Sequence, residues 1–252
     1  MATQRSRPPS YDAAQAVREL TEGDPKLGRL IARAGPFRLT LDSTQSPFEA
    51  LVRSIIYQQL HGKAAAAIHA KLLATFAGDE ELAHPSAQHL LDCPNEQLRG
   101  AGLSHNKALA LRDLAAKTLD GTVPTLARIR RMSDEDIIAH LTQVRGVGRW
   151  TVEMFLMFRL GRPDVLPTSD YGVRKGFALT FQALKPGTKV TPELLPKPAE
   201  MERRAKRWHP WCSVASWYLW RACDLADADK SSVRASVKIK AGGKPAKNSA
   251  SA

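Results

Sequence analysis

The residues best suited to chemistry lie between Val144 and Lys175. Gly146 and Gly148 separate two predicted helices, and a single carboxylate, that of Asp170, follows further along the chain. Glycines permit a tight turn and a close approach of the backbone to a phosphate, and the amides at the start of a helix attract an anion. A phosphate-binding turn followed by an acid is typical of chemistry on nucleic acid. The same glycines also suit an ordinary turn between helices, so both interpretations remain open at this point.

The carboxylate of Asp170 also has two roles open to it. It can stabilise positive charge that develops on a sugar, or it can cap the helix that is predicted to begin after it. Residue type and spacing alone do not separate these roles.

The elements that must position these groups are helical. Ser46, Pro47 and Glu49 form a helix start signal, with a capping serine, a proline in the first turn and a glutamate three residues after the cap. Apolar residues then recur at three- and four-residue spacing as far as Leu60. Further helices are predicted at residues 63–76, 86–92, 105–119, 134–142, 149–160, 171–182, 199–207 and 213–226. Only Phe37–Leu41 alternates like a strand, so we expect an all-α fold to which this segment adds at most a small N-terminal strand.

The charge of the chain favours an anionic partner. The formal net charge is +12, and nucleic acid is the commonest anionic partner of a basic protein. Residues 227–252 carry six basic and two acidic side chains, so about +4 of this charge lies in the tail. A solvated basic surface without a partner is the alternative.

The ends of the chain differ in composition from its centre. Residues 227–252 are rich in Lys, Ser, Ala and Gly and almost free of large apolar groups, so we expect a disordered basic tail. Residues 1–9 are expected to be disordered as well. The folded domain is then 10–226, with its hairpin at about 134–160.

Cysteine and histidine spacing gives no metal motif. Cys93, Cys212 and Cys223 are scattered and odd in number, and the nearest ligand pair, His89 with Cys93, has no further partners nearby in the sequence. We therefore expect neither a disulfide framework nor a zinc or iron-sulfur site. No apolar run is long enough for a membrane span and no secretory signal is visible, so no membrane partner and a cytoplasmic location are expected.

Four ordered segments carry a resemblance to a known family. They are PFEALVRSIIYQQLHGKAA at 47–65, LRGAGLSHNKALALRDLA at 98–115, LTQVRGVGRWTVEMFLMF followed by DVLPTSDYGVRKGF, and RWHPWCSVASWYLWRACDLAD at 207–227. The chain resembles the helix-hairpin-helix DNA glycosylases, and among them most resembles the 3-methyladenine DNA glycosylase II group of alkylation repair. The resemblance implies two helical subdomains flanking a cleft.

The family motif places the essential acid on Asp170. Ser169 stands where some relatives carry a second aspartate, so one carboxylate is available to stabilise an oxocarbenium-like transition state. An alkylated purine is already cationic and leaves without a general acid, so the resemblance points to alkylated bases. Relatives that also cut the backbone have a lysine where this chain has Trp150, which implies a monofunctional hydrolase. Lys107 and Lys175 do not stand at that position.

The resemblance also implies a base pocket and a DNA contact surface. An enzyme acting on a base must extrude it from the duplex and fill the gap. The pocket residues are expected to be Trp150, Met154, Tyr171 and Trp220, whereas Trp208, Trp211 and Trp217 are expected to pack in the core. The DNA-binding residues are expected to be Gln58, Gln59, Leu60, His61, Lys63, Gly146, Val147, Gly148 and Arg149. Leu60 can instead simply close an apolar helix face, and many relatives have serine at the His61 position.

Two further features come from the resemblance alone. The hairpin is expected to hold a structural monovalent cation through the backbone carbonyls of Thr142, Val144 and Val147, with no cofactor required for catalysis. Cys212 departs from the arginine that relatives often have, which predicts the loss of a local charge contact.

The leading hypothesis is therefore a monomeric enzyme of base excision repair that acts on double-stranded DNA. It would hydrolyse the N-glycosidic bond of 3-methyladenine and 7-methylguanine and leave an abasic site, and it would associate with the nucleoid if the protein is bacterial. A non-catalytic module of the same fold that binds damage or abasic sites is the second hypothesis. A glycosylase with lyase activity on oxidised bases is the third, and Trp150 argues against it.

Overall fold

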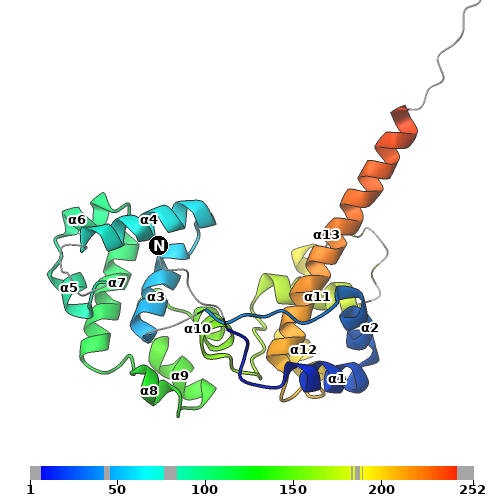
Figure 1. The fold of residues 1–252 in the computed structure, drawn as a ribbon, viewed down its shortest axis with the longest axis horizontal. Helices are drawn as coiled ribbons and strands as arrows, with labels where there is room; N and C mark the ends of the chain where they lie inside the picture. The colour runs from blue at the N-terminus through cyan, green and yellow to red at the C-terminus, as the bar shows by residue number, and fades with distance from the viewer. Residues whose placement is uncertain are drawn as a thin grey trace, which may run out of the picture. The chain divides into compact units, whose positions relative to one another are not determined.

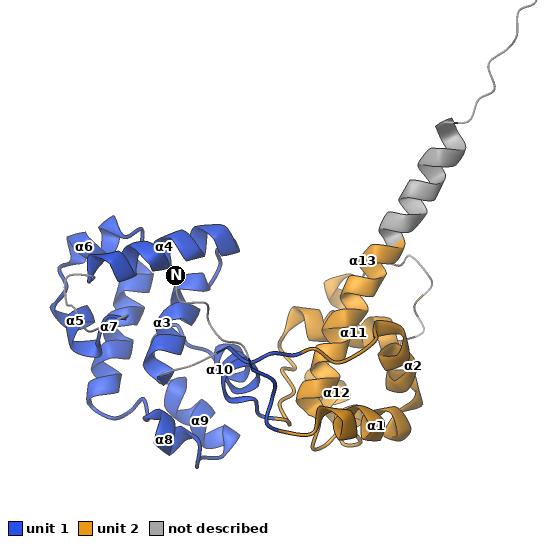
Figure 2. Ribbon diagram, viewed as in Figure 1, with its two compact units in different colours: residues 1–10, 39–162 blue, residues 11–38, 163–252 orange. Residues whose placement is uncertain are grey.

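The computed structural model describes residues 7–42, 46–76, 84–182, 184, 188 and 190–242, and their side chains as far as residue 229. The chain divides into two compact units, coloured blue and orange in Figure 2. Unit 1 comprises residues 1–10 and 39–162, and unit 2 comprises residues 11–38 and 163–252. The described parts of both units are helical, without a β-strand, which confirms the predicted all-α fold.

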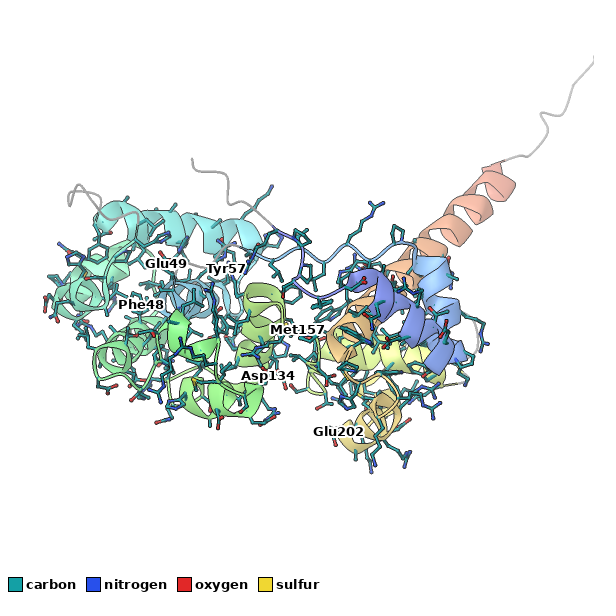
Figure 3. The ribbon with its side chains drawn as sticks, turned by 60° about the horizontal axis from the view of Figure 1, so that its bottom comes forward. Phe48, Glu49, Tyr57, Asp134, Met157 and Glu202 are labelled. Carbon is teal, nitrogen blue, oxygen red and sulfur yellow. The ribbon has the colours of Figure 1, made fainter. Side chains whose placement is uncertain are left out.

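Unit 1 is built around α7 (Figure 1). Helices α3 and α5 pack against α7, and Leu111 and Leu114 are fully buried in this packing. Phe48 lies at the start of α3, with its side chain buried, and Tyr57 ends that helix (Figure 3). The helices are α3 (Pro47–Tyr57), α4 (Gly62–Thr75), α5 (Ala87–Asp92), α6 (Asn95–Gly100), α7 (His105–Leu119), α8 (Leu126–Ile129), α9 (Asp134–Leu141) and α10 (Arg149–Phe155), the last extended by a π-helical turn (Leu156–Leu160).

Unit 2 is built around α13. Helices α2 and α11 pack against it, and its core includes Trp208, Tyr218 and Phe177, all almost fully buried. Trp211 and Trp217 are partly buried against the same core, so the predicted packing role of these tryptophans is confirmed. The helices are α1 (Ala13–Gly23), α2 (Pro25–Ala34), α11 (Tyr171–Phe181), a short 3-10 helix (Pro192–Leu194), α12 (Pro198–Ala205) and α13 (Cys212–Gly242).

A buried carboxylate joins three segments of unit 2. Asp24 has no exposed surface, and its oxygens accept hydrogen bonds from Arg204 at 2.8 and 2.6 Å and from the indole of Trp208 at 3.0 Å. The same side chain caps the start of α2. A buried charge is tolerated only when it is paired and fully hydrogen-bonded, and Asp24 meets that condition.

The strand predicted at Phe37–Leu41 is wrong. Leu41 forms only an isolated antiparallel bridge with Arg7, through two backbone hydrogen bonds of 3.1 and 2.7 Å. This segment carries the chain from unit 2 into unit 1, between Arg38 and Leu39, and alternation alone cannot make a strand without a longer partner. The bridge also corrects the N-terminal boundary, since Arg7 was predicted to lie in a disordered end.

Two helices of unit 2, α1 and α2, are absent from the predicted set. Both nevertheless carry start signals, because Asp12 caps α1 and Asp24 caps α2 with Pro25 in its first turn. These helices could therefore have been found from the sequence.

The C-terminal boundary also needs correction. α13 continues to Gly242, so residues 227–242 are helical where disorder was predicted, while 243–252 lie outside the described residues. A helix that is already nucleated by packing lengthens at little cost, and Ala, Lys and Arg favour its propagation. Despite its length, α13 is not apolar enough for a membrane span, and neither is any other described helix.

Candidate active site

The predicted glycine turn is a helix hairpin in unit 1. α9 ends at Leu141, Gly146 adopts a left-handed φ of +76°, and α10 begins at Arg149. The amide of Val147 donates to the carbonyl of Val144 at 3.0 Å, and both valine side chains are buried. The hairpin is therefore anchored by apolar side chains while its glycines remain exposed.

The two glycines of the hairpin serve different needs. Gly146 is required by its backbone conformation, because a side chain at a positive φ is strained. Gly148 has an ordinary φ of −96°, and a Cβ added there would meet no atom within 4 Å. Nothing within the described chain requires glycine at 148. An external group that approaches the backbone closely gives a reason for it, and Gly148 leaves the start of α10 without a side-chain cap.

The turn between α3 and α4, called the wedge turn below, holds Gln58, Gln59, Leu60 and His61 of the predicted DNA contacts. Gln59 has a φ of +56°, the only positive value at a non-glycine residue among the described residues. Such conformations concentrate at binding and catalytic sites. Leu60 is 38% exposed, and His61 precedes α4 without capping it through its side chain. Lys63 is exposed in the first turn of α4. These features fit a turn that presents side chains to a partner.

Gln58 has a structural contact in addition to its predicted role in DNA binding. Its Nε2 donates to the carbonyl of Gly146 at 2.9 Å and so links the wedge turn to the hairpin. Its own carbonyl accepts a hydrogen bond of 2.9 Å from Lys107 of α7, which also donates to the carbonyl of Ile56 at 2.6 Å. Lys107 thus satisfies two carbonyls at the end of α3 and fixes the start of the turn.

Helix α7 also holds the hairpin, through residues that follow Lys107 in the sequence. The carboxylate of Asp113 accepts the amide of Arg145 at 2.7 Å and the ammonium of Lys117 at 2.8 Å, and Lys117 also donates to the carbonyl of Gln143. Burial opposes the effect, but these hydrogen bonds hold the pKa of Asp113 below its ordinary value. Helix α7 therefore positions both loops. The sequence carries no signal for this role of the α7 residues, because their partners are backbone atoms.

Arg149 is also bound within unit 1. Its guanidinium forms two hydrogen bonds with Glu135, at 3.0 and 2.6 Å, and one of 3.1 Å with the buried Glu153. Hydrogen bonding to Glu135 is the main cause that raises the pKa of Arg149. Its side chain is thus tied to two carboxylates, and its backbone amide, at the start of α10, is the better candidate for an anion contact.

Asp170 lies in unit 2, immediately before α11. Its Oδ1 accepts the amide of Val173 at 2.7 Å and the indole Nε1 of Trp220 at 2.8 Å. Both roles proposed for this residue are thus compatible, since the carboxylate caps α11 and is oriented by a tryptophan expected in the pocket. Two donors on one oxygen fix the plane of the carboxylate.

Glycines bring Trp220 close to Asp170. A Cβ at Gly172 would lie 2.6 Å from Cδ1 of Trp220 and 3.2 Å from Oδ1 of Asp170. One turn later, a Cβ at Gly176 would lie only 1.9 Å from the carbonyl oxygen of Leu219. The missing side chains let α11 and α13 approach closely, and so Trp220 reaches the first turn of α11.

Two of the three aromatic residues expected in the pocket are exposed, while Trp220 is partly buried against the core of unit 2. Trp150 is 44% exposed in unit 1 and Tyr171 is 57% exposed in unit 2. Met154 follows Trp150 by one helical turn and is half-buried. Leu60, Trp150 and Tyr171 are three of the five large apolar side chains exposed in the described chain, the others being Leu119 and Leu194. Both aromatic rings are therefore accessible to a partner from solvent.

Comparison with known proteins relates this site to a family. The model of the HhH-GPD superfamily base excision DNA repair proteins matches residues 52–210, more than half of the chain. The sequence is 34% identical over 203 residues to DNA-3-methyladenine glycosylase 1 of Schizosaccharomyces pombe, covering 80% of this chain and 84% of that protein. The chain belongs to the HhH-GPD superfamily.

Two solved structures of similar proteins support this assignment. One is the Schizosaccharomyces pombe 3-methyladenine DNA glycosylase Mag1 in complex with abasic DNA, with a TM-score of 0.67 and 32% identity over 82% of this chain and 95% of that one. The other is a DNA-3-methyladenine glycosidase from Bacillus halodurans, with a TM-score of 0.70 and 30% identity over 86% and 92% of the two chains. The family predicted from the sequence is therefore confirmed.

The cation that the resemblance implied for the HhH-GPD hairpin stays a prediction. Thr142 is the C-cap of α9, where a helix leaves carbonyls without intrahelical donors. The carbonyl of Val144 accepts the Val147 amide with one of its two lone pairs. Backbone carbonyls at such positions suit a hard monovalent cation.

Cys212 has a polar environment within this HhH-GPD chain. Its amide donates to Oδ1 of Asp164 at 3.2 Å, and its thiol lies beside His209. The carboxylate of Asp164 is thus partnered by His209 and Cys212.

Proposed function

We propose that this protein is a monofunctional DNA glycosylase that removes alkylated purines, 3-methyladenine and 7-methylguanine, from double-stranded DNA. The reaction breaks the bond between C1′ of deoxyribose and the base nitrogen, whose electron pair leaves with the base. Water adds to C1′ and loses a proton, giving an abasic site. Membership of the HhH-GPD superfamily and similarity to proteins named DNA-3-methyladenine glycosylase support this proposal.

The carboxylate of Asp170 is the observation that carries the proposal. It is oriented by the Val173 amide and the Trp220 indole, in the segment that the family motif assigns to the reactive acid. A fixed carboxylate stabilises positive charge developing on the sugar without reorganisation at the moment of reaction. Ser169, the residue before it, cannot protonate a leaving base as a second carboxylic acid would. Bases that are already cationic are the substrates that need no such proton.

The residue at position 150 sets the outcome of the reaction. A lyase needs an amine to form a Schiff base with the sugar, and an indole cannot do so. We therefore propose base release without strand cleavage. Borohydride treatment during turnover should trap no covalent DNA adduct.

Two loops of unit 1 are proposed to bind the DNA. The hairpin offers exposed glycines at 146 and 148 and the amides that open α10, and the turn after α3 offers Gln59, Leu60 and His61. Phosphate contacts of this kind fix the position of a duplex without reading its sequence. We further propose a monomer that acts in the cytoplasm, which size-exclusion chromatography and cell fractionation can test.

The test is the variant Asp170→Asn. The amide oxygen of asparagine can still accept from Val173 and Trp220, so folding should be preserved while the negative charge is lost. Release of methylated purines from alkylated DNA should fall by about 100-fold or more, with binding to abasic-site DNA largely unchanged. Asp12→Asn is the matched control, because Asp12 caps α1 of the same unit in a similar way and should leave the rate unchanged.

Two results would overturn the proposal. Undiminished base release by Asp170→Asn would exclude the carboxylate from the reaction. A wild-type protein that binds abasic-site DNA yet releases no methylated base would instead favour a non-catalytic binding module of the same fold.

A further inference from the structure

Three side chains that can bind a metal ion converge at the start of α13. Asp164 comes from the loop before α11, His209 from the turn after α12, and Cys212 is the first residue of α13. One ligand atom from each residue lies within 4.8 Å of the other two. In the described part of the chain this is the single group of three such residues. All three belong to unit 2.

The spacing of the sulfur and nitrogen atoms is close to that of a coordination shell, whereas the nitrogen and oxygen atoms lie closer together. Sγ of Cys212 lies 3.7 Å from Nδ1 of His209. A tetrahedral zinc ion with ordinary bond lengths separates such atoms by about 3.5 Å. Oδ2 of Asp164 lies 2.7 Å from the same Nδ1 and would have to move outward by about 0.6 Å to match that shell. The side chains of His209 and Asp164 are 55% and 33% exposed, so they can open toward solvent.

The segments that carry the ligands are fixed by surrounding hydrogen bonds. The amide of Cys212 donates to Oδ1 of Asp164 at 3.2 Å, which leaves Oδ2 facing the histidine. The amide of Ser213 donates to the carbonyl of Pro163 at 2.9 Å, and the amide of Val165 donates to the hydroxyl of Ser213 at 3.0 Å. Such outer contacts orient ligands before an ion arrives.

The arrangement does not match a catalytic relay. In a relay of thiol, imidazole and carboxylate, the two partners contact opposite ring nitrogens. Here the thiol and the carboxylate of Asp164 both approach Nδ1 of His209. Capping of α13 explains the bond between Asp164 and the Cys212 amide, but it explains neither the thiol nor the imidazole beside it.

We propose that Asp164, His209 and Cys212 form a site for a transition-metal dication of the zinc class. The sulfur, nitrogen and oxygen donors suit a borderline-soft ion, and water on the exposed side would complete a four-coordinate shell. Because metals bind the thiolate, binding at Cys212 would release the thiol proton to solvent. The site is independent of the proposed glycosylase activity.

The test uses cobalt(II) as a probe for the zinc class. Chelator-treated full-length protein is titrated with Co²⁺, and thiolate-to-cobalt charge transfer and visible ligand-field bands are recorded. One equivalent should bind, and Zn²⁺ should displace it. Cys212→Ser and His209→Gln should each weaken Co²⁺ binding by at least about 10-fold, whereas Cys93→Ser and Cys223→Ser should bind like the wild type.

The controls separate this site from the other thiols. His209 is exposed, so His209→Gln should fold even if Cys212→Ser does not. Absence of a charge-transfer band in the wild type would overturn the proposal. So would a band that survives both Cys212→Ser and His209→Gln, or one that is lost in Cys223→Ser alone.

Discussion

In unit 1 the groups proposed to contact DNA are backbone atoms of the hairpin and side chains of the turn after α3, whereas in unit 2 the proposed reactive group is one side chain. The loops of unit 1 are held by polar side chains of α7, Lys107, Asp113 and Lys117, which bind backbone carbonyls and an amide. Asp170 of unit 2 is held by its cap position and by Trp220, which close packing against α11 brings into reach. Long polar side chains allow small adjustments of a loop, while close-packed helices allow almost none. We therefore expect single substitutions at the supporting residues to cost less stability and activity in unit 1 than in unit 2.

The largest effect is expected for Asp24→Asn. Removing the charge leaves Arg204 without its buried partner, and breaking such a pair costs about 3–5 kcal/mol of unfolding free energy. Urea unfolding followed by tryptophan fluorescence measures this loss, because Trp208, which bonds to Asp24, lies in the same core. An unchanged unfolding midpoint would contradict the assigned role of Asp24.

The stability difference between wild type and Asp24→Asn should depend on pH. Burial opposes the effect, but the hydrogen bonds from Arg204 and Trp208 leave the pKa of Asp24 below its ordinary value. A carboxylate with a lowered folded-state pKa stabilises the fold fully above its unfolded pKa of about 3.9, and this stability is lost as pH falls through the folded value. The difference in unfolding free energy between wild type and Asp24→Asn should therefore shrink with acidification below about pH 4. A difference that stays constant down to pH 2 would contradict the assignment.

Gly172→Ala tests the close packing around Asp170. The new Cβ would collide with Trp220 and displace its indole from the carboxylate, so base release should fall by about 10-fold or more. Single-turnover release of 7-methylguanine measures the change. Gly100→Ala is the control, because a Cβ there meets no atom within 4 Å. Equal rates for both variants would mean that the contact with Trp220 does not position Asp170.

Lys107→Met tests the polar support in unit 1. Loss of the ammonium leaves the carbonyls of Ile56 and Gln58 without their donor, at a cost of about 1–3 kcal/mol. We expect weaker binding to abasic-site DNA and a smaller change in the rate of base release from the bound complex. Lys71→Met, which removes an exposed lysine of α4, controls for charge. If Lys107→Met and Lys71→Met weaken DNA binding equally relative to the wild type, Lys107 acts only through its charge.

The smallest effect is expected for Trp150→Ala. An exposed indole attracts a cationic base by about 0.5–2 kcal/mol, so kcat/KM for 7-methylguanine should fall by about 2- to 30-fold. Binding of duplex DNA that carries an uncharged base such as hypoxanthine should weaken less. Leu119→Ala removes a similarly exposed apolar side chain from the same unit and should change neither. Equal losses for charged and uncharged bases would indicate apolar contact rather than attraction of a cation.

The sequence by itself determined much of this protein. Helix starts such as Ser46 with Pro47 are local features, because a cap and its amides lie within four residues of one another. The hairpin glycines and Asp170 could be recognised for the same reason, since their family motifs are short and contiguous. Alternation at Phe37–Leu41 misled because a strand also needs a partner, which a local pattern cannot show.

The tertiary structure decided which distant residues support these motifs. Lys107 and Asp113 of α7 bind backbone atoms of the loops. Every residue has such backbone atoms, so the sequence does not show which of them are bound. The glycines of α11 have meaning only beside α13, where they admit Trp220. Asp164 comes together with His209 and Cys212 only in the folded chain. Local signals arise from contacts within a few residues, whereas these arrangements depend on packing between helices far apart in the sequence.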